Sequence, residues 1–156
     1  MSKSLKRVKA ALRDAEVEVE IMETGVDTRT AAQAAAVAGC HVDQIAKSII
    51  FRGEASGTAI LFLTAGGNRV SEASASQLAG EALGKADATL IRAQTGFAIG
   101  GVSPVGHLNP IRAFMDPRLM EFDTVWAAAG TPHHIFRVAP DMVQRLTGAS
   151  VAAFTD

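Results

Sequence analysis

Residues 96–107 constrain the fold of this chain more than any other segment, because four glycines and one proline occur within these twelve positions. Glycine adopts positive φ values that other residues avoid, and it lets another group approach the main chain closely. Pro104 fixes its own φ and lacks an amide donor, which stiffens the turn. No Lys-Ser or Lys-Thr pair follows, so the segment is not an NTPase phosphate loop.

Two interpretations of this loop remain open at the level of the residues. It could present amide N–H groups to a carbonyl or an oxyanion, or it could be a structural turn that only connects two elements. The adjacent pair Gly100 and Gly101 favours the first, because two glycines in a row cost conformational entropy without an evident gain in packing.

Length and composition fit one globular domain over residues 1–156. Hydrophobic residues make up 48% and charged residues 20%, so the chain can bury a core and has no bias towards disorder. The net charge of −1 argues against bulk electrostatic binding of nucleic acid, although it allows a local basic surface. Cys40 is the only cysteine, which excludes an intrachain disulfide and a thiolate metal cluster.

The sequence contains no targeting or membrane signal. Residues 1–20 are charged throughout and lack the apolar core of a signal peptide. The longest apolar run, residues 59–63, is far too short to span a bilayer. We therefore expect a cytoplasmic protein that makes no membrane contact.

Hydrophobic periodicity predicts a mixture of helices and strands. A helix over residues 4–15 has one apolar face and an otherwise basic surface, which is either solvated or in contact with a phosphate. Strands predominate in the middle without a strict βαβ repeat, so we expect a single α+β domain with a mixed, strongly curled β-sheet flanked by helices. Further helices are expected at 30–39, 71–83 and 140–148, and strands at 17–22, 45–51, 58–64, 111–115, 124–129, 134–138 and 150–154.

Three details of this prediction are less defined. Residues 88–94 fit either a helix or a strand, and residues 68–70 could continue the sheet. The pair at 116–117 is expected to form a turn, because proline presets the backbone for it.

Lys47 is the most unusual residue of the predicted strands. Alternation places it on the same face as Ile49 and Phe51, so its amine leaves a largely apolar surface. An ammonium group there is either partly desolvated, with a lowered pKa, or held beside an anion. Alternatively, a lysine near a strand end extends its amine into water.

The histidines do not form a recognisable catalytic or metal-binding pattern. No His-Glu-x-x-His spacing and no Gly-x-Ser-x-Gly motif occurs, so we predict no metal site, no cofactor and no catalytic triad. His107 directly follows the glycine-rich loop and could line its mouth, while His133 and His134 follow a predicted turn. An ordinary surface position explains each of them equally well.

Several segments resemble the YbaK/prolyl-tRNA synthetase-associated editing-domain family in residue type, order and spacing. Lys47 and the Gly-x-x-x-Pro loop from Gly100 to Pro104 carry the most specific part of this resemblance. It covers the chain from Thr28 onward, through segments 45–51, 95–96, 100–106, Asp116, 127–130 and 140–146.

The resemblance implies a hydrolase that deacylates a mischarged aminoacyl-tRNA carrying a small non-cognate amino acid, most often on proline tRNA. The chain contains only the editing domain, so it is similar to freestanding members that act in trans, as a monomer or homodimer. Prolyl-tRNA synthetase is the protein partner that the resemblance suggests. No cofactor or metal is implied, because the free ribose hydroxyl of the tRNA is thought to help activate water.

The resemblance also implies roles for individual residues. Backbone N–H donors of the loop formed by Gly100, Gly101, Val102, Ser103 and Pro104 would bind the carbonyl oxygen that becomes an oxyanion. The two glycines would allow close approach of the substrate, and the proline would hold the loop in shape. Lys47 would position the terminal phosphate or ribose and the developing charge.

Specificity is expected to come from the pocket wall, for which the candidates are Val102, His107 and the turn at 131–134. A histidine in this C-terminal region helps to select the amino acid in related insertion domains, which points to His133 or His134. Thr30 matches a threonine near the start of the family domain and could line the pocket, but helix capping explains it equally well. His107 and Val105 differ from the residues that many members carry after the proline, which leaves the amino acid open.

Two other classes of function stay possible on the sequence alone. The chain could be a non-catalytic module that binds tRNA or a synthetase, although the retained Lys47 and intact loop argue against lost activity. It could also hydrolyse another small acyl ester, which the same loop would serve. Activity on free aminoacyl esters would favour that alternative.

Overall fold

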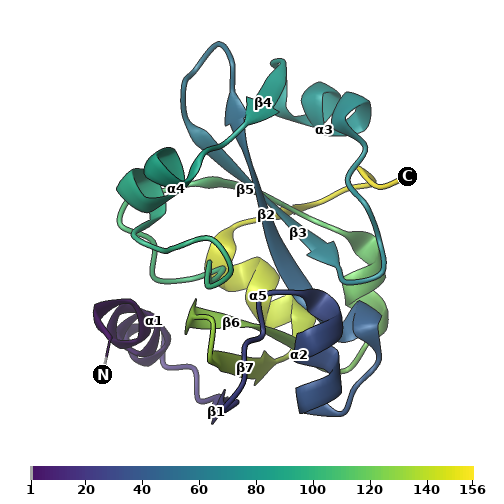
Figure 1. Cartoon of the computed structure of the whole chain (residues 1–156). Coiled ribbons are helices and arrows are strands. Elements are labelled where there is room, and N and C mark those ends of the chain that lie inside the picture. The colour runs from purple at the N-terminus through teal and green to yellow at the C-terminus, as the bar shows by residue number, and fades with distance from the viewer. Residues whose placement is uncertain (1) are drawn as a thin grey trace.

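The computed structural model describes residues 2–156, in which helices and short strands alternate (Figure 1). The helices are α1 (Lys3–Asp14), α2 (Ala31–Ala38), α3 (Glu72–Ala79), α4 (Ala88–Thr95) and α5 (Pro140–Thr147), with short 3-10 turns η1 (Val42–Gln44) and η2 (Pro117–Glu121). The strands are β1 (Glu20–Glu23), β2 (Ala46–Gly53), β3 (Ala59–Ala65), β4 (Leu83–Lys85), β5 (Arg112–Met115), β6 (Val125–Thr131), β7 (His134–Val138) and β8 (Ser150–Val151).

The strands of the described chain are divided between two sheets. β1, β7 and β6 form an antiparallel sheet in that order, while the larger sheet has the order β4-β2-β3-β5-β8. In the larger sheet, β3 runs parallel to β5 and β5 parallel to β8, whereas its other pairs are antiparallel. Ile45 forms a parallel bridge with Trp126 between the two sheets. The predicted α+β class with a mixed sheet is therefore confirmed.

β3 is the centre of the larger sheet, and each of its residues is buried. Leu61 and Leu63 face the main core, which also receives the apolar side of α1. Ile60 and Phe62 face the opposite side, where they meet α3 and Phe154. A strand with both faces covered needs apolar residues at every position, which explains the continuous apolar run rather than an alternating one.

The helix ends match their sequence signals. Thr30 accepts a hydrogen bond from the Gln33 amide in a capping box, and Gly39 ends α2 in the left-handed conformation. Pro140 starts α5 and Gly148 ends it, again with positive φ. No helix among residues 2–156 is both long enough and apolar enough to cross a bilayer.

Two predicted elements are shorter than expected, because local turns end them. α1 closes with Glu16 at φ 58°, and the Val17 amide donates to the Leu12 carbonyl, so residues 17–19 do not pair and β1 begins only at Glu20. The helix predicted over 71–83 ends at Ala79, because Gly80 adopts the left-handed conformation. Residues 83–85 instead form β4, which pairs with the end of β2.

The remaining ambiguous segments resolve as follows. Residues 88–95 form a helix, which Asp87 caps through the Leu90 amide. Residues 68–70 form no strand, and only Val70 bridges, to Thr155. The strand predicted at 150–154 is limited to its first two residues. The turn at 116–117 leads into η2, capped by the Asp116 side chain.

Phe62 makes ring contacts with Phe51, Phe114 and Phe154 at centroid distances of 5.7, 5.2 and 5.1 Å. We expect Phe62→Ala to lower the free energy of unfolding by about 3–5 kcal/mol, because the removed ring leaves a cavity in a packed cluster. Urea unfolding measures the change, with Leu78→Ala on the exposed side of α3 as the control. Equal effects of the two substitutions would contradict a central role for this ring.

Candidate active site

A cavity of about 720 Å³ extends along the first half of β2, where the larger sheet lies next to β6 and β7. Its other walls come from the start of α2, from residues 85–91 and from residues 99–102 of the glycine-rich loop. The volume is typical of a site for a small molecule or cofactor, for which about 300–1,000 Å³ is usual. Segments far apart in the sequence thus meet around a single cavity.

The predicted site residues divide between the cavity and its surroundings. Thr30, Lys47, Gly100 and Val102 line the cavity. Thr30 therefore has both of the roles that its sequence context allowed, since it also caps α2. The predicted residues outside the lining are Gly101, Ser103, Pro104, His107, His133 and His134.

The Lys47 ammonium is held by backbone carbonyl groups. Its Nζ donates to the carbonyl oxygens of Gly66, at 3.2 Å, and Asn68, at 2.7 Å. Partial burial and the nearby Arg69 lower the Lys47 pKa, while the carboxylates of Asp116 and Asp43 oppose this shift. An ammonium group has three donors, so one stays available for a ligand in the cavity.

The turn that holds Lys47 is itself fixed by two carboxylates. Asp116 is 2% exposed, and its Oδ2 accepts from the Ala65 amide at 3.1 Å and from Asn68 Nδ2 at 2.9 Å. Asp43 accepts from the Gly67 amide at 2.8 Å and from Arg118 Nε at 3.0 Å. Although burial opposes it, these hydrogen bonds lower the Asp43 pKa. The carbonyls that bind Lys47 are therefore rigidly placed.

The two adjacent glycines of the loop have different roles. Gly100 has φ 91°, and a Cβ there would lie 2.9 Å from the Arg29 Cγ. A Cβ on Gly101 would lie 2.9 Å from the Thr131 Cα, so the neighbouring backbone requires a glycine at this position. The sequence had instead favoured a role of the glycine pair towards a ligand. The Gly101 amide donates to the Ala98 carbonyl at 3.0 Å within the turn.

This arrangement leaves the amides of Gly100 and Val102 among the loop donors beside the cavity. Both residues line it, and within residues 2–156 neither amide donates a hydrogen bond. Two backbone donors on one rigid loop are the elements of an oxyanion site.

Arg7 of α1 binds both ends of the glycine-rich loop, which lies between α4 and α1 in Figure 1. Its Nη2 donates to the Gly96 carbonyl at 2.7 Å and its Nε to the Gly106 carbonyl at 3.2 Å. The guanidinium also lies over the Phe97 ring, 5.0 Å from its centroid. Sequence periodicity had placed Arg7 on a basic surface, but the structure assigns it a structural contact.

Ser103, Pro104 and His107 form the inner side of the loop rather than the cavity wall. Ser103 is fully buried, and its Oγ accepts from the Val105 amide at 3.2 Å. His107 Nε2 donates to the Ser103 carbonyl at 2.6 Å, and the ring packs edge-on against Phe97. His107 was expected to line the mouth, but its ring turns towards α1 and the core.

The pKa of His107 is below its ordinary value. Burial is the main cause and the charge of Arg7 adds to it, whereas the hydrogen bond to Ser103 opposes the shift. Its Nδ1 is buried and has no partner among the described residues. Protonation would therefore place an unpaired charge in the interior.

His133 and His134 lie on the turn between β6 and β7, outside the cavity. His133 Nε2 is 3.4 Å from Asp27 Oδ1, and His134 Nδ1 shares a hydrogen bond of 2.6 Å with Thr131 Oγ1. The Thr28 hydroxyl donates to the Pro132 carbonyl at 2.7 Å, which ties this turn to the segment before α2. No three His, Cys, Asp or Glu side chains between residues 2 and 156 are arranged to hold a metal ion.

The lining residues that were not singled out from the sequence include Arg29, Ser48, Lys85 and Trp126. The Ser48 Oγ is buried and has no hydrogen-bond partner within the described chain. Its position next to Lys47 was a usable signal. Nothing local in the sequence distinguishes the two cationic side chains from other surface residues.

We expect Arg7→Ala to lower the free energy of unfolding by about 1.5–3 kcal/mol, because a charged donor is lost from two carbonyls. Arg7→Lys should recover only part of this, since an ammonium group lacks the planar fork that reaches both carbonyls. Urea unfolding measures each change. Arg13→Ala, on an exposed part of the same helix, is the control, with an expected change within about 0.5 kcal/mol. A control effect as large as that of Arg7→Ala would contradict the structural role.

His107 predicts a pH dependence of stability. Its folded pKa lies below the ordinary value of 6.5, so between these values the unfolded chain binds more protons than the folded one. The free energy of unfolding should therefore fall as the pH decreases below about 6.5, and level off once the pH is below the folded pKa. His107→Gln should flatten this dependence in urea unfolding between about pH 5 and 7.5. Equal pH dependence of the free energy of unfolding in the wild type and in His107→Gln would contradict this prediction.

Comparison with known proteins gives consistent results. Residues 26–146 match the family described as "Aminoacyl-tRNA editing domain". The Bacillus subtilis (strain 168) protein named "Uncharacterized protein YwhH" is 29% identical over 148 residues, which is 95% of this chain and 94% of YwhH.

Two solved structures have the same fold. One, described as a candidate trans-editing enzyme for prolyl-tRNA synthetase, is 43% identical with a TM-score of 0.93, covering 100% of this chain and 99% of the other. The hypothetical protein APE2540 is 27% identical with a TM-score of 0.88, covering 96% and 99%. The family match covers most of the chain, including every residue that lines the cavity, and the chain therefore belongs to the aminoacyl-tRNA editing domain family.

Proposed function

We propose that this protein is an aminoacyl-tRNA deacylase that acts in trans and hydrolyses the ester of a small non-cognate amino acid, with proline tRNA as the first candidate. The observation that carries the proposal is the cavity itself, which Lys47, Gly100 and Val102 line together. Membership in the editing family supports the reaction class. The printed description of its 43% identical structural relative supports the prolyl system.

The reaction forms one bond and breaks one. Water adds to the acyl carbon, and the carbonyl oxygen becomes an oxyanion to which the Gly100 and Val102 amides donate. Collapse of this intermediate breaks the bond to the ribose oxygen, which leaves as a hydroxyl after taking a proton. The products are the free amino acid and uncharged tRNA.

Proton transfer from water does not fall to a residue of the lining, because the lining has no Asp, Glu, His or Cys. Lys47 already donates to two carbonyls, so we assign it positioning and charge stabilisation rather than the role of a base. We assign the proton acceptor to the neighbouring ribose hydroxyl of the tRNA, as the family resemblance implies.

The apolar part of the cavity provides the acyl subsite. Ile45, Trp126 and Ile135 are buried in one cluster that also borders the cavity. Rigid walls of this kind exclude large side chains, whereas differences of one methylene change binding by only about 1–3 kcal/mol.

The test is deacylation of proline tRNA charged with Ala, Cys, Ser, Thr, 2-aminobutyrate or Pro. We expect selective release of one non-cognate residue, and a loss of about a hundredfold or more in kcat for Lys47→Ala, because a charge beside the transition state is removed. Lys6→Ala, on the exposed side of α1, is the matched control and should retain wild-type activity. Urea unfolding verifies that both variants are folded.

Other results would redirect the assignment. Equal hydrolysis of a simple aminoacyl ester and of the charged tRNA would indicate a hydrolase of small acyl esters. Binding of tRNA without release of any amino acid would indicate a non-catalytic module. Full activity of Lys47→Ala would contradict the mechanism.

A further inference from the structure

The cavity lining carries a charge opposite to that of the whole chain. The protein has 15 basic and 16 acidic residues, a net charge of −1. The lining contains three cationic side chains, Arg29, Lys47 and Lys85, and no Asp or Glu. A positive lining in a slightly acidic protein indicates an anionic ligand, because no carboxylate among the described lining residues offsets the three cations.

Lys85 lies at a distance from the groups assigned to the chemistry. In the sheet it pairs with Phe51 of β2, four positions beyond Lys47. At about 3.3 Å per residue, its backbone is therefore about 13 Å along the strand from Lys47. This length exceeds the size of a small amino acid, so a ligand that reaches both lysines extends well beyond the acyl group.

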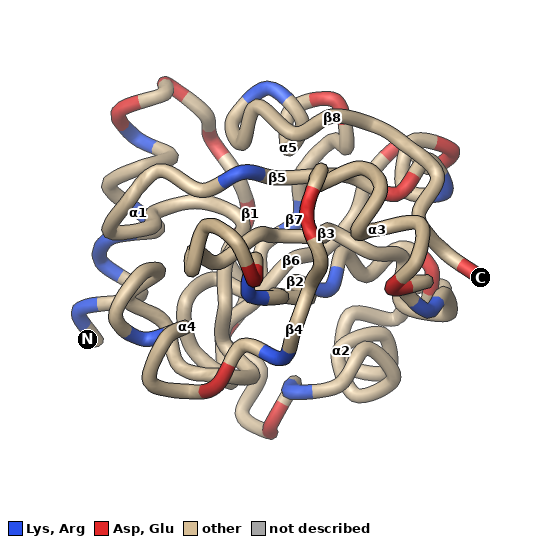
Figure 2. Tube along the Cα trace, turned by 90° about the horizontal axis from the view of Figure 1, so that it is seen from above, with Lys and Arg blue, Asp and Glu red and all other residues tan. Residues whose placement is uncertain are grey.

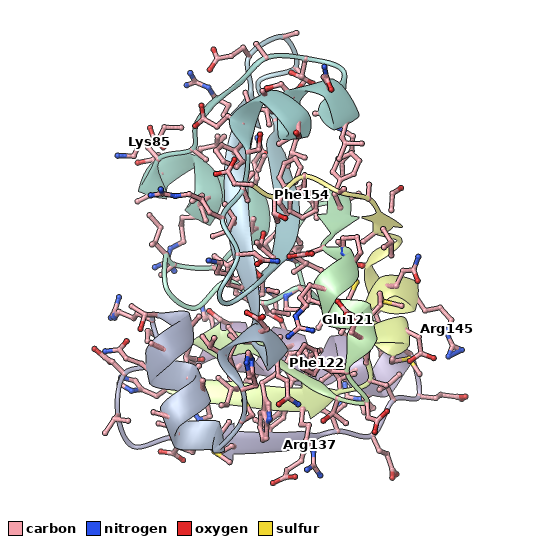
Figure 3. All side chains as sticks on the ribbon, turned by 90° about the vertical axis from the view of Figure 1, so that its right-hand side faces the viewer. Lys85, Glu121, Phe122, Arg137, Arg145 and Phe154 are labelled. Atoms are coloured by element: carbon pink, nitrogen blue, oxygen red, sulfur yellow. The ribbon has the colours of Figure 1, made fainter. Side chains whose placement is uncertain are left out.

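The Lys85 side chain is exposed and forms no ion pair within residues 2–156. Figure 3 shows it extending away from the fold, on the side that faces the viewer in Figure 1. A cation without a neighbouring carboxylate is free to meet a phosphate.

Arg29 approaches the same cavity from the segment before α2. Its Cγ lies against Gly100, where a Cβ would be 2.9 Å away, so the aliphatic part of the side chain is placed beside the loop. The Arg29 side chain is 54% exposed, and its Nε lies 3.5 Å from Asp27 Oδ2 in a loose surface pair. Figure 2 shows the basic segments at the end of β4 and before α2 on the same side of the molecule.

We propose that Lys85 and Arg29 form a phosphate subsite for the sugar–phosphate backbone that precedes the acylated nucleoside, so that the acceptor strand leaves the cavity past the end of β4. This inference rests on the proposed function. The reacting ester lies between Lys47 and the loop, and the strand then runs along β2 towards Lys85. Exposed cations suit this role, because phosphate contacts orient a nucleic acid and dissociate readily with salt.

The experiment compares wild type, Lys85→Ala and Arg29→Ala on a charged acceptor-stem minihelix and on the matching aminoacyl adenosine, which lacks phosphates. We expect Lys85→Ala to raise KM for the minihelix about three- to tenfold with little change in kcat, since one phosphate contact is lost. The decrease in kcat/KM caused by Lys85→Ala should be larger on the minihelix than on the adenosine ester. The slope of log(kcat/KM) against log[salt] should decrease by about 0.7, the value for one contact to a single strand.

Arg52→Ala is the matched control, because Arg52 lies on the neighbouring strand, pairs with Glu54 and does not line the cavity. It should leave KM and the salt slope at wild-type values. The subsite proposal would be overturned if Lys85→Ala lowered kcat/KM equally on both substrates, or if it left KM and the salt slope unchanged.

Binding separates failure of the subsite from failure of the proposed function. The dissociation constant of the uncharged minihelix is measured by fluorescence anisotropy at several salt concentrations. If the wild type binds the minihelix but deacylates no substrate, the proposed deacylase activity is refuted. The subsite proposal then still requires that Lys85→Ala binds the minihelix more weakly and with less salt dependence. Identical binding curves for wild type and Lys85→Ala would refute the subsite alone.

Discussion

The burial of β3 on both faces is the constraint from which the rest of the site follows. This strand pairs with β2 on one side and β5 on the other, and both of its faces are covered by core side chains. A strand held in this way leaves little freedom for the turn that follows it. That turn carries the carbonyls of Gly66 and Asn68, to which the Lys47 ammonium binds. Asp116, at the end of β5, completes the support from the adjacent strand.

The glycine-rich loop obtains its rigidity from outside itself. Arg7 binds the carbonyls at both of its ends, and Gly101 packs on the backbone of Thr131. Backbone donors stabilise an oxyanion best when they need no rearrangement during the reaction, and these contacts provide that preorganisation. α1 lies outside residues 26–146, which match the editing family, yet it contributes the residue that holds the loop.

Charge is distributed locally rather than over the whole molecule. Some cations of the surface pair with carboxylates, as Arg52 does with Glu54 and Arg137 with Glu20. The charged side chains among the described residues that line the cavity are all cationic. A protein arranged in this way concentrates positive charge at one place on its surface, which suits local binding of an anionic group.

Local signals in the sequence were sufficient for the fold class, the helix caps and the two long strands β2 and β3. Thr30, Gly39, Pro140 and Gly148 act through hydrogen bonds and φ values within a few residues, so the sequence alone determines them. The sequence also pointed to the glycine-rich loop and Lys47 as candidate site residues, and the resemblance named the family that the comparison confirmed. Misplaced boundaries, such as the end of α3, occurred where two glycines were available as helix ends.

Only the tertiary structure decided how these parts face one another. His107 lies behind its loop because a neutral ring can fill the space between Phe97 and Ser103, and no periodicity reports on that space. Arg7 contacts residues about ninety or more positions away, and Arg29 and Lys85 meet across one cavity from separate elements. The physical reason is that periodicity and capping depend on near neighbours in the chain, whereas the direction of a side chain towards a distant partner depends on how whole elements pack.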